Sequence, residues 1–358
     1  MKRKYVAGIA AIMMGASMVL SGCGDNNSSK GGEEGNGGSG DKGVVNVFTA
    51  RHYDIDFAMF DKFETETGIT VNEIKGTAEE LVERMKREGE STEADLFITV
   101  DGGVLNYAKE SGVLQPIESE AIFANVPEKY RDTDNQWIGL ATRARVIAYA
   151  KDRVTPEQLS TYEALAEEQW KGKLLVRSSS NLYNQSLVAS LIELNGEEAA
   201  EQWASGVVAN FARDPEGGDR DQAKAIAAGT GDVAIMNTYY VGQMLHSKDA
   251  EEVKVAEGLG VFFPNQATTG THLNISGIGL TKHAKNKDNA LKLVEFMTGK
   301  EGQEMLTNGS FEFPVNEAAE LPELLKEWGA FTTQTLDFAK LGEYNKKATE
   351  LMNKAGWK

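Results

Sequence analysis

The stretch VVNVFTARHYDIDFAMFDKFETETGITVNEIK (Val44–Lys75) reads as a strand, a helix and a second strand in succession. Val44–Thr49 is an apolar run with the length and composition of a buried strand. Three phenylalanines follow at helical spacing: Phe57, Phe60 and Phe63. Asp54 or Asp56 can cap the expected helix, and Gly68 can end it. This order of elements predicts an α/β fold.

The same alternation continues along the chain in two series. In the first, a strand at 69–74 is followed by a helix over 77–88, which opens with a capping-box pattern, and by a strand at 95–100. The second comprises strands at 146–149, 173–176, 232–236, 255–263 and 275–280 and helices at 182–194, 197–210 and 219–228. Strands that alternate with helices predict a mainly parallel sheet covered on both faces. The two series predict two α/β units.

Length and composition narrow the class of protein. A chain of 358 residues is too long for one small core and fits two domains of ordinary size. Its hydrophobic fraction of 41% and charged fraction of 25% are typical of a globular protein. A single cysteine excludes an internal disulfide, a zinc cage and an iron–sulfur cluster built on thiolates. The net charge of −17 argues against nucleic acid as a partner and is compatible with a cationic ligand.

The N-terminal segment has the pattern of a secretory signal. Three positive charges at Lys2–Lys4 precede a short apolar run over residues 5–20. The run ends in Leu20-Ser21-Gly22-Cys23, which resembles a bacterial lipobox, in which the cysteine is acylated and becomes the first mature residue. We therefore expect a lipoprotein signal peptide at 1–22 and lipidation of Cys23; the alternative is an ordinary signal peptide with a chance cysteine. Removing the three charges lowers the formal net charge from −17 to −20.

Residues 23–43 have the composition of a flexible tether. They consist almost entirely of Gly, Ser, Asn, Asp, Glu and Lys, which cannot bury a core. A flexible segment of about 20 residues spans roughly 25 Å on average. The sequence therefore predicts a folded body held near a membrane and free to move.

Four tyrosines stand in the expected turns between strands and helices: Tyr53, Tyr183, Tyr239 and Tyr240. Ligands of open α/β sheets bind beyond the carboxyl ends of the strands, so these side chains occupy the positions of a binding site. His52, one of four histidines, precedes the first of them. Taken singly, each tyrosine is more often a packed ring with a hydrogen-bonded hydroxyl. Spacing alone leaves both interpretations open.

Phenols gathered at one site would suit a hard trivalent cation. A phenol ionises near pH 10 in water, but a strong Lewis acid bound to its oxygen lowers that value greatly. Phenolate is then a hard anionic donor suited to Fe3+. Four phenolates around Fe3+ leave one negative charge, which a neighbouring arginine would offset by hydrogen bonds. Arg143 and Arg145, between the two expected units, are candidates for this role.

Several motifs together resemble the ferric iron-binding proteins of bacterial iron ABC importers, in the subgroup that carries a His-Tyr and a Tyr-Tyr pair. The motifs that carry the resemblance are Arg51-His52-Tyr53, Arg177-Ser178-Ser179-Ser180-Asn181-Leu182-Tyr183-Asn184-Gln185-Ser186-Leu187, Gly217-Gly218-Asp219-Arg220, Asn237-Thr238-Tyr239-Tyr240 and Gly270-Thr271-His272-Leu273-Asn274-Ile275-Ser276-Gly277. The likeness extends over nearly the whole chain from Val44. It implies a type II periplasmic-binding-protein fold, with two lobes joined by two crossing strands. The first lobe would comprise 44–142 and about 265–315, the second about 143–264 and 316–358.

The resemblance also implies a set of metal ligands. Tyr53 would reach Fe3+ from the first lobe, and three tyrosines would reach it from the second: Tyr183, Tyr239 and Tyr240. His52 matches a histidine that is a fifth ligand, and Arg143 matches an arginine beside the metal. Another branch of the family uses a glutamate and a bound phosphate. No glutamate stands at the matching loop, so we expect a site without an obligatory phosphate, with carbonate as a possible further ligand.

The function implied is capture of Fe3+ outside the cytoplasmic membrane and delivery to an ABC permease and its ATPase. The protein is expected to be a monomer, attached to the membrane through its lipid anchor and not bound to nucleic acid. The alternative within transport is a binding protein for a small organic cation such as a polyamine or thiamine, with Trp137 and Trp170 as aromatic walls. An enzyme is not expected, because the sequence has no Gly-x-Ser-x-Gly elbow, His-Glu-x-x-His motif or Walker loop.

Overall fold

The computed structural model describes residues 43–358. The expected signal peptide, the lipidation site Cys23 and nearly all of the expected tether lie outside the described residues. Within the described part, no helix combines the length and the apolar character that crossing a membrane requires.

The strands form a continuous mixed sheet. Its order is β2 (Thr70–Lys75), β1 (Val44–Thr49), β3 (Leu96–Thr99), β9 (Leu273–Thr281), β5 (Trp137–Ala150), β7 (Val233–Asn237) and β6 (Leu174–Leu175). Three short strands lie beside this path: β4 (Leu114–Gln115) on β9, and β8 (Leu259–Phe262) and β10 (Phe313–Pro314) on β5. The outer pairs β1–β2, β1–β3 and β6–β7 are parallel, as expected, but β5 and β9 run antiparallel to their neighbours. The prediction of a mainly parallel sheet is therefore wrong at its centre.

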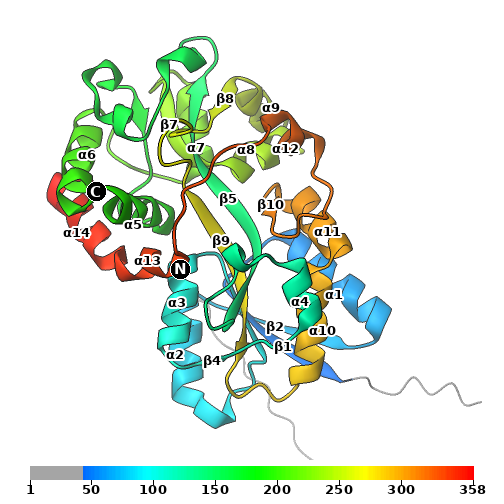
Figure 1. Ribbon diagram of the computed structural model, residues 1–358. Helices are drawn as coiled ribbons and strands as arrows, with labels where there is room; N and C mark the ends of the chain where they lie inside the picture. Colours follow the sequence, from blue (N-terminus) through cyan, green and yellow to red (C-terminus); the bar gives the residue numbers. More distant parts are fainter. Residues whose placement is uncertain (1–42) are drawn as a thin grey trace, which may run out of the picture. The chain divides into compact units, whose positions relative to one another are not determined.

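Fourteen α-helices cover the sheet in the described part. They are α1 (Asp54–Thr67), α2 (Ala78–Glu88), α3 (Gly102–Glu110), α4 (Glu120–Asn125), α5 (Leu182–Asn195), α6 (Glu197–Ala209), α7 (Asp219–Ala227), α8 (Thr238–Leu245), α9 (Ala250–Glu257), α10 (Lys287–Thr298), α11 (Lys300–Ser310), α12 (Glu323–Trp328), α13 (Phe338–Glu343) and α14 (Asn345–Ala355). Figure 1 shows α2 and α3 on one side of the lower strands, with α1, α4 and α10 on the other. In the upper half, α5, α6, α13 and α14 lie on one side and α7, α8 and α9 on the other.

Buried side chains form two sets of cores, which define two lobes. Those of the first lobe come from residues 45–141 and 275–315, and those of the second from 147–259 and 341–357. Among the strands of residues 43–358, only β5 and β9 run through both lobes, paired with each other in antiparallel register (Figure 1). All 14 residues of β5 and all nine of β9 are buried. The two long strands thus join the lobes and connect their cores.

Most expected elements are found, but three differ in detail. The helix after the first strand begins at Asp54 with Tyr53 as its N-cap, and Asp56 binds Arg51 instead of capping the helix. The strand expected at 146–149 is the end of the much longer β5. The strand expected at 255–263 is α9 followed by β8. Residues 250–257 form a helix although their valines favour a strand. The helix is stabilised by its N-cap, because the Asp249 carboxylate accepts a hydrogen bond from the Glu251 N–H.

The capping and stop signals read from the sequence are confirmed. The Thr77 hydroxyl accepts from the Glu80 N–H while the Glu80 carboxylate accepts from the Thr77 N–H, which completes the capping box of α2. Gly68 ends α1 in the left-handed region at φ +72°. These local signals set the end of α1 and the beginning of α2.

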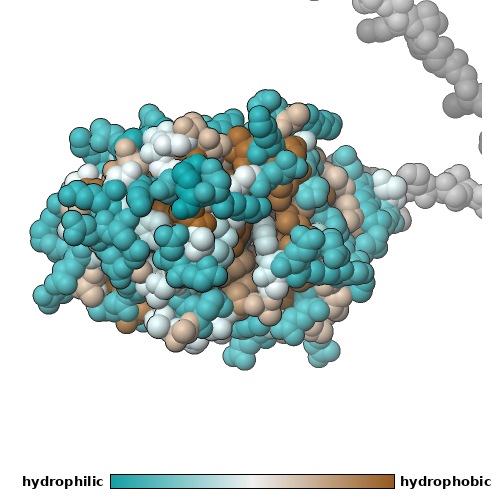
Figure 2. Space-filling view, turned by 90° about the horizontal axis from the view of Figure 1, so that it is seen from above, coloured by the Kyte–Doolittle hydropathy of each residue, from teal (hydrophilic) through white to brown (hydrophobic). Residues whose placement is uncertain are grey.

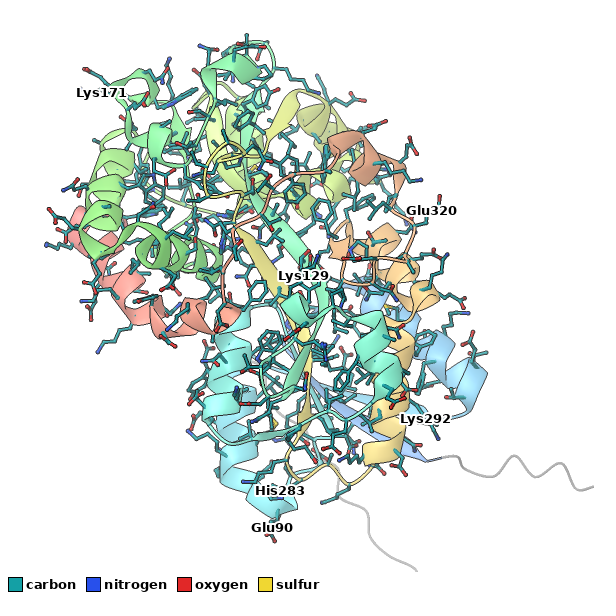
Figure 3. The ribbon with its side chains drawn as sticks, in the orientation of Figure 1. Glu90, Lys129, Lys171, His283, Lys292 and Glu320 are labelled. Atoms are coloured by element: carbon teal, nitrogen blue, oxygen red, sulfur yellow. The ribbon has the colours of Figure 1, made fainter. Side chains whose placement is uncertain are left out.

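The face of the described part that is seen from above is dominated by polar side chains. Seen from above, hydrophilic residues cover most of the face, and apolar residues show between them (Figure 2). Among the labelled side chains of Figure 3, Glu90, Lys171, Lys292 and Glu320 lie at the periphery, as does His283 at the far end of the first lobe. His283 is therefore remote from the region where the lobes meet.

Candidate metal centre

The four predicted tyrosines all stand at helix N-termini. Tyr53 is the N-cap of α1, Tyr183 is the second residue of α5, and Tyr239 and Tyr240 lie in the first turn of α8. The N-terminus of a helix carries a partial positive charge, which favours anionic groups. Three helix ends thus favour ionised oxygens on these side chains.

The structure brings the four tyrosines together around Tyr239, which is fully buried. The Tyr239 hydroxyl donates to the Tyr183 hydroxyl at 3.3 Å. The Tyr239 ring lies 4.2 Å from that of Tyr240 and 6.0 Å from that of Tyr53, measured between centroids. One tyrosine of the first lobe therefore meets three of the second.

Burial favours the protonated form of three of the phenols, those of Tyr53, Tyr239 and Tyr240, when no cation is present. It raises the pKa of Tyr53 and Tyr239 well above the ordinary value of 10, helped by Glu312 for Tyr53 and by the other phenols for Tyr239. The pKa of Tyr240 is raised as well, again mainly by burial. A ligand that stabilises the phenolates must therefore offset a large desolvation penalty. A trivalent cation bound directly to the oxygens can do so.

Three arginines surround the ring of Tyr183. Their Cζ atoms lie 5.3 Å (Arg143), 5.5 Å (Arg177) and 6.0 Å (Arg145) from its centroid. Arg145 is committed elsewhere, because its Nη1 pairs with Asp219 at 2.8 Å and its Nη2 donates to Asn184 at 2.7 Å. It holds the second lobe's loops in place.

Arg143 has more unused hydrogen-bond donors than the other two arginines. Its Nη1 donates to Ser276 Oγ at 3.2 Å and lies 3.9 Å from a Glu312 oxygen. Its Nε and Nη2 are buried and have no hydrogen-bond partner among residues 43–358. Buried donors of this kind are costly unless an acceptor completes them. Arg143 therefore offers free donors beside the ring of Tyr183.

Sequence reasoning missed a buried charge network under Tyr53. Arg51 pairs with Asp56 at 3.1 Å and with Glu312 at 2.8 Å, and all three side chains are almost fully buried. The Arg51 Cζ lies 4.6 Å from the centre of the Tyr53 ring. Arg51 stood in a quoted motif, but Glu312 follows it by 261 residues and no local pattern points to it.

His52 is not brought into this cluster. Its side chain is exposed and borders a hollow of about 420 Å³ together with Glu79, Ser180 and Gln185. In the part of the chain that the structure describes, no hydrogen bond or ring contact joins it to a tyrosine. The same part contains no group of three or more His, Cys, Asp or Glu side chains arranged to hold a metal. The phenol cluster is therefore the site with the donor chemistry for a hard cation.

Comparison with known proteins places the chain in a family. Residues 91–340 match the family model described as bacterial extracellular solute-binding protein. The chain belongs to this family. The solute-binding protein is 46% identical over 319 residues to iron uptake protein A1 of Synechocystis sp., covering 89% of each chain. It is 31% identical to the Fe(3+)-binding periplasmic protein of Serratia marcescens, covering 89% of this chain and 91% of that one.

Solved structures agree with the fold and the resemblance. The Trichodesmium protein FutA (IdiA), in complex with iron and citrate ligands, is 46% identical, with a TM-score of 0.84 over 88% of this chain and all of that one. The ferric binding protein of Campylobacter jejuni gives 41% identity and a TM-score of 0.83 over the same shares. The expected type II periplasmic-binding-protein fold and the resemblance to ferric-binding proteins are confirmed.

Proposed function

We propose that the solute-binding protein captures Fe3+ outside the cytoplasm for an iron uptake system. Its relatives are ferric iron-binding proteins of such systems. The observation that carries the proposal is the gathering of four phenols from both lobes at one buried point. The alternative, an organic cation such as a polyamine, is not favoured, because the relatives that the chain matches include ferric iron-binding proteins. The family is one of transport proteins, in keeping with the expectation that the chain is not an enzyme.

In this proposal Tyr53, Tyr183, Tyr239 and Tyr240 are the ligands of Fe3+. Each phenol loses its proton when the cation binds, and the helix N-termini stabilise the resulting anions. Because Tyr53 belongs to the first lobe and the others to the second, the cation gains its full ligand set only when the lobes are closed. Fe3+ therefore favours the closed state by its differential affinity.

Two further residues complete the proposed site, one as a ligand and one beside the metal. His52 would be a fifth donor after its side chain turns inward from the exposed position that it occupies next to Tyr53. Arg143 would neutralise the residual negative charge, and its free Nε and Nη2 would hold a small oxyanion such as carbonate against the cation. A relative's structure is in complex with iron and citrate ligands, which supports an anion as a partner of the cation.

The lobe boundaries are also proposed, with one refinement. The first crossing lies in β5 near the expected boundary at 142–143. Asn265 accepts from the Tyr162 N–H and donates to Glu163, which are residues of the second lobe. We therefore place the return crossing within β9 and not at about 265. The segment 316–337 would lead back from the first lobe to α13 and α14.

Delivery would require partners outside the described residues. We propose that an ABC permease and its ATPase receive the iron, and that the acylated Cys23 holds the protein, as a monomer, at the outer face of the membrane. The tether would let the folded body reach the permease. Mass spectrometry of the membrane fraction tests the anchor: a diacylated N-terminal Cys23 supports it, and an unmodified or upstream N-terminus contradicts it.

A visible absorption spectrum tests the metal site. Adding Fe3+ as its nitrilotriacetate complex to the iron-free protein should produce a phenolate-to-iron charge-transfer band. The double change Tyr239→Phe and Tyr240→Phe should abolish the band, because it removes two donor oxygens and preserves the rings. Tyr149→Phe is the matched control: Tyr149 is a largely buried tyrosine of the second lobe outside the cluster, and its loss should leave the band intact. If the wild-type protein stays colourless after Fe3+ is added, the proposal is wrong.

A further inference from the structure

Phe311 has a backbone conformation that a phenylalanine rarely adopts. It follows the last residue of α11 and lies in the left-handed region at φ +61°, ψ +21°. Glycine or asparagine is the usual residue at such a helix end, because a side chain with Cβ is strained there. Strained residues persist where surrounding contacts determine them, often at functional sites. The contacts of the Phe311 ring should therefore explain its presence.

Those contacts are made by α8. The Phe311 ring is stacked on His246, with centroids 4.5 Å apart and planes inclined by 30°. It also covers Gly242 so closely that a Cβ placed there would lie 2.6 Å from the Phe311 Cβ. Beside it, Gln243 Nε2 donates to the Ser310 carbonyl at 3.3 Å. Only a glycine at position 242 lets the ring approach the helix in this way.

The contact joins the two lobes. α11, which ends at Ser310, packs on α1 and α10 of the first lobe, whereas α8 packs on α9 and β7 of the second. Phe311 is 8% exposed, so its ring is buried by a helix of the opposite lobe. Opening the lobes would separate α11 from α8 and expose the ring to water.

The same short segment also reaches both halves of the phenol cluster. Gly242 lies in α8 one turn after Tyr239. The contact of the Phe311 ring with Gly242 therefore affects the position of the helix that carries two of the phenols. On the other side, Glu312 binds Arg51, whose guanidinium lies against Tyr53. Residues 310–312 thus contact the supports of the cluster in each lobe.

We propose that Phe311 is a positioning residue that latches the closed state, by seating its ring on Gly242 and His246 of α8. The inference rests on the proposed function, because it concerns the closure that completes the iron site. Phe311 touches no metal ligand atom; it acts by raising the fraction of molecules in which Tyr53 meets the other phenols. Apparent affinity scales with that fraction. Burying an aromatic ring on closure is sufficient to change it about tenfold.

The substitution Phe311→Asn removes the aromatic ring and should preserve the backbone conformation. Asparagine tolerates the left-handed conformation, so the end of α11 should keep its geometry. Iron loaded as the nitrilotriacetate complex should leave the variant for excess chelator about tenfold faster than it leaves the wild type. The position of the charge-transfer band should not change, because the ligands are the same. Small-angle X-ray scattering of the iron-free variant should give a larger radius of gyration, as the lobes open more often.

Phe296→Ala is the matched control, because Phe296 packs against Phe63 within the first lobe. It should lower the unfolding midpoint without changing the iron release rate or the radius of gyration. A double change of Phe311→Asn with His246→Ala should release iron no faster than Phe311→Asn alone, since both substitutions remove the same contact between the two rings.

The outcomes separate the latch from the iron site. If Phe311→Asn releases iron at the wild-type rate and has the wild-type radius of gyration, the latch is overturned. If wild-type protein takes up no Fe3+, the proposed function fails instead. The scattering comparison of the iron-free proteins then decides the latch, with an unchanged radius of gyration overturning it.

Discussion

His272 makes the stability of this protein depend on pH in a way that the structure allows us to calculate. The residue precedes β9 and is 1% exposed. Its Nε2 is 3.0 Å from Ser186 Oγ and its Nδ1 is 2.9 Å from Gln334 Oε1. Burial lowers the pKa of His272 from 6.5 to about 4, since the hydrogen bond to Gln334 only partly opposes the loss of hydration. The ring is therefore neutral in the folded protein near neutral pH.

The sign and size of the effect follow from proton linkage. Below pH 6.5 the unfolded chain binds a proton at His272, whereas the folded protein does not until about pH 4. The free energy of unfolding therefore falls as the pH falls through this window. At about 1.4 kcal/mol per pKa unit, the full loss is about 3 kcal/mol, of which about 2 kcal/mol appears between about pH 7 and about pH 5.

Urea unfolding of the iron-free protein at several pH values in this window measures the effect. His272→Gln retains a polar side chain but cannot titrate, so its stability should fall less on acidification than that of the wild type, by about 2 kcal/mol at about pH 5. Carboxylates contribute equally to both proteins and cancel in the comparison. His283→Gln, at the periphery (Figure 3), should retain the wild-type pH dependence. Parallel curves for His272→Gln and wild type would refute the reasoning.

Three further predictions concern the site. Because burial raises the pKa of Tyr53 and Tyr239, Fe3+ must displace their protons, so iron affinity should rise with pH; chelator competition across pH measures it, and a pH-independent affinity would contradict phenolate ligation. Glu312→Gln removes one of the two buried carboxylates that pair with Arg51. It should lower the free energy of unfolding measured in urea by about 3 kcal/mol, whereas the same substitution at an exposed residue such as Glu317 should change it negligibly. Arg143→Gln should weaken iron binding about tenfold, because the residual negative charge loses its counter-ion; unchanged affinity would remove Arg143 from the site.

Local signals in the sequence were sufficient to predict most of the helices and strands and their order along the chain. The capping box at Thr77 and the glycine stop at Gly68 depend on residues a few positions apart, and they form as expected. The position of the tyrosines could be predicted for a similar reason. Each follows a strand, and the loops at the carboxyl ends of parallel strands share one edge of a sheet. The sequence thus determined which side chains stand at the edge of each lobe.

Only the tertiary structure decided how those edges meet. The length of β5 was not evident, because Arg143 and Arg145 interrupt its apolar pattern and find their partners in distant segments. The pairing of Arg51 with Glu312, 261 residues later, and the seating of Phe311 on α8 likewise have no local signature. His52 lies next to Tyr53 in the chain, yet its side chain is exposed and lines a separate hollow. Burial and charge compensation are set by whatever the fold brings alongside, and spacing along the chain does not encode them.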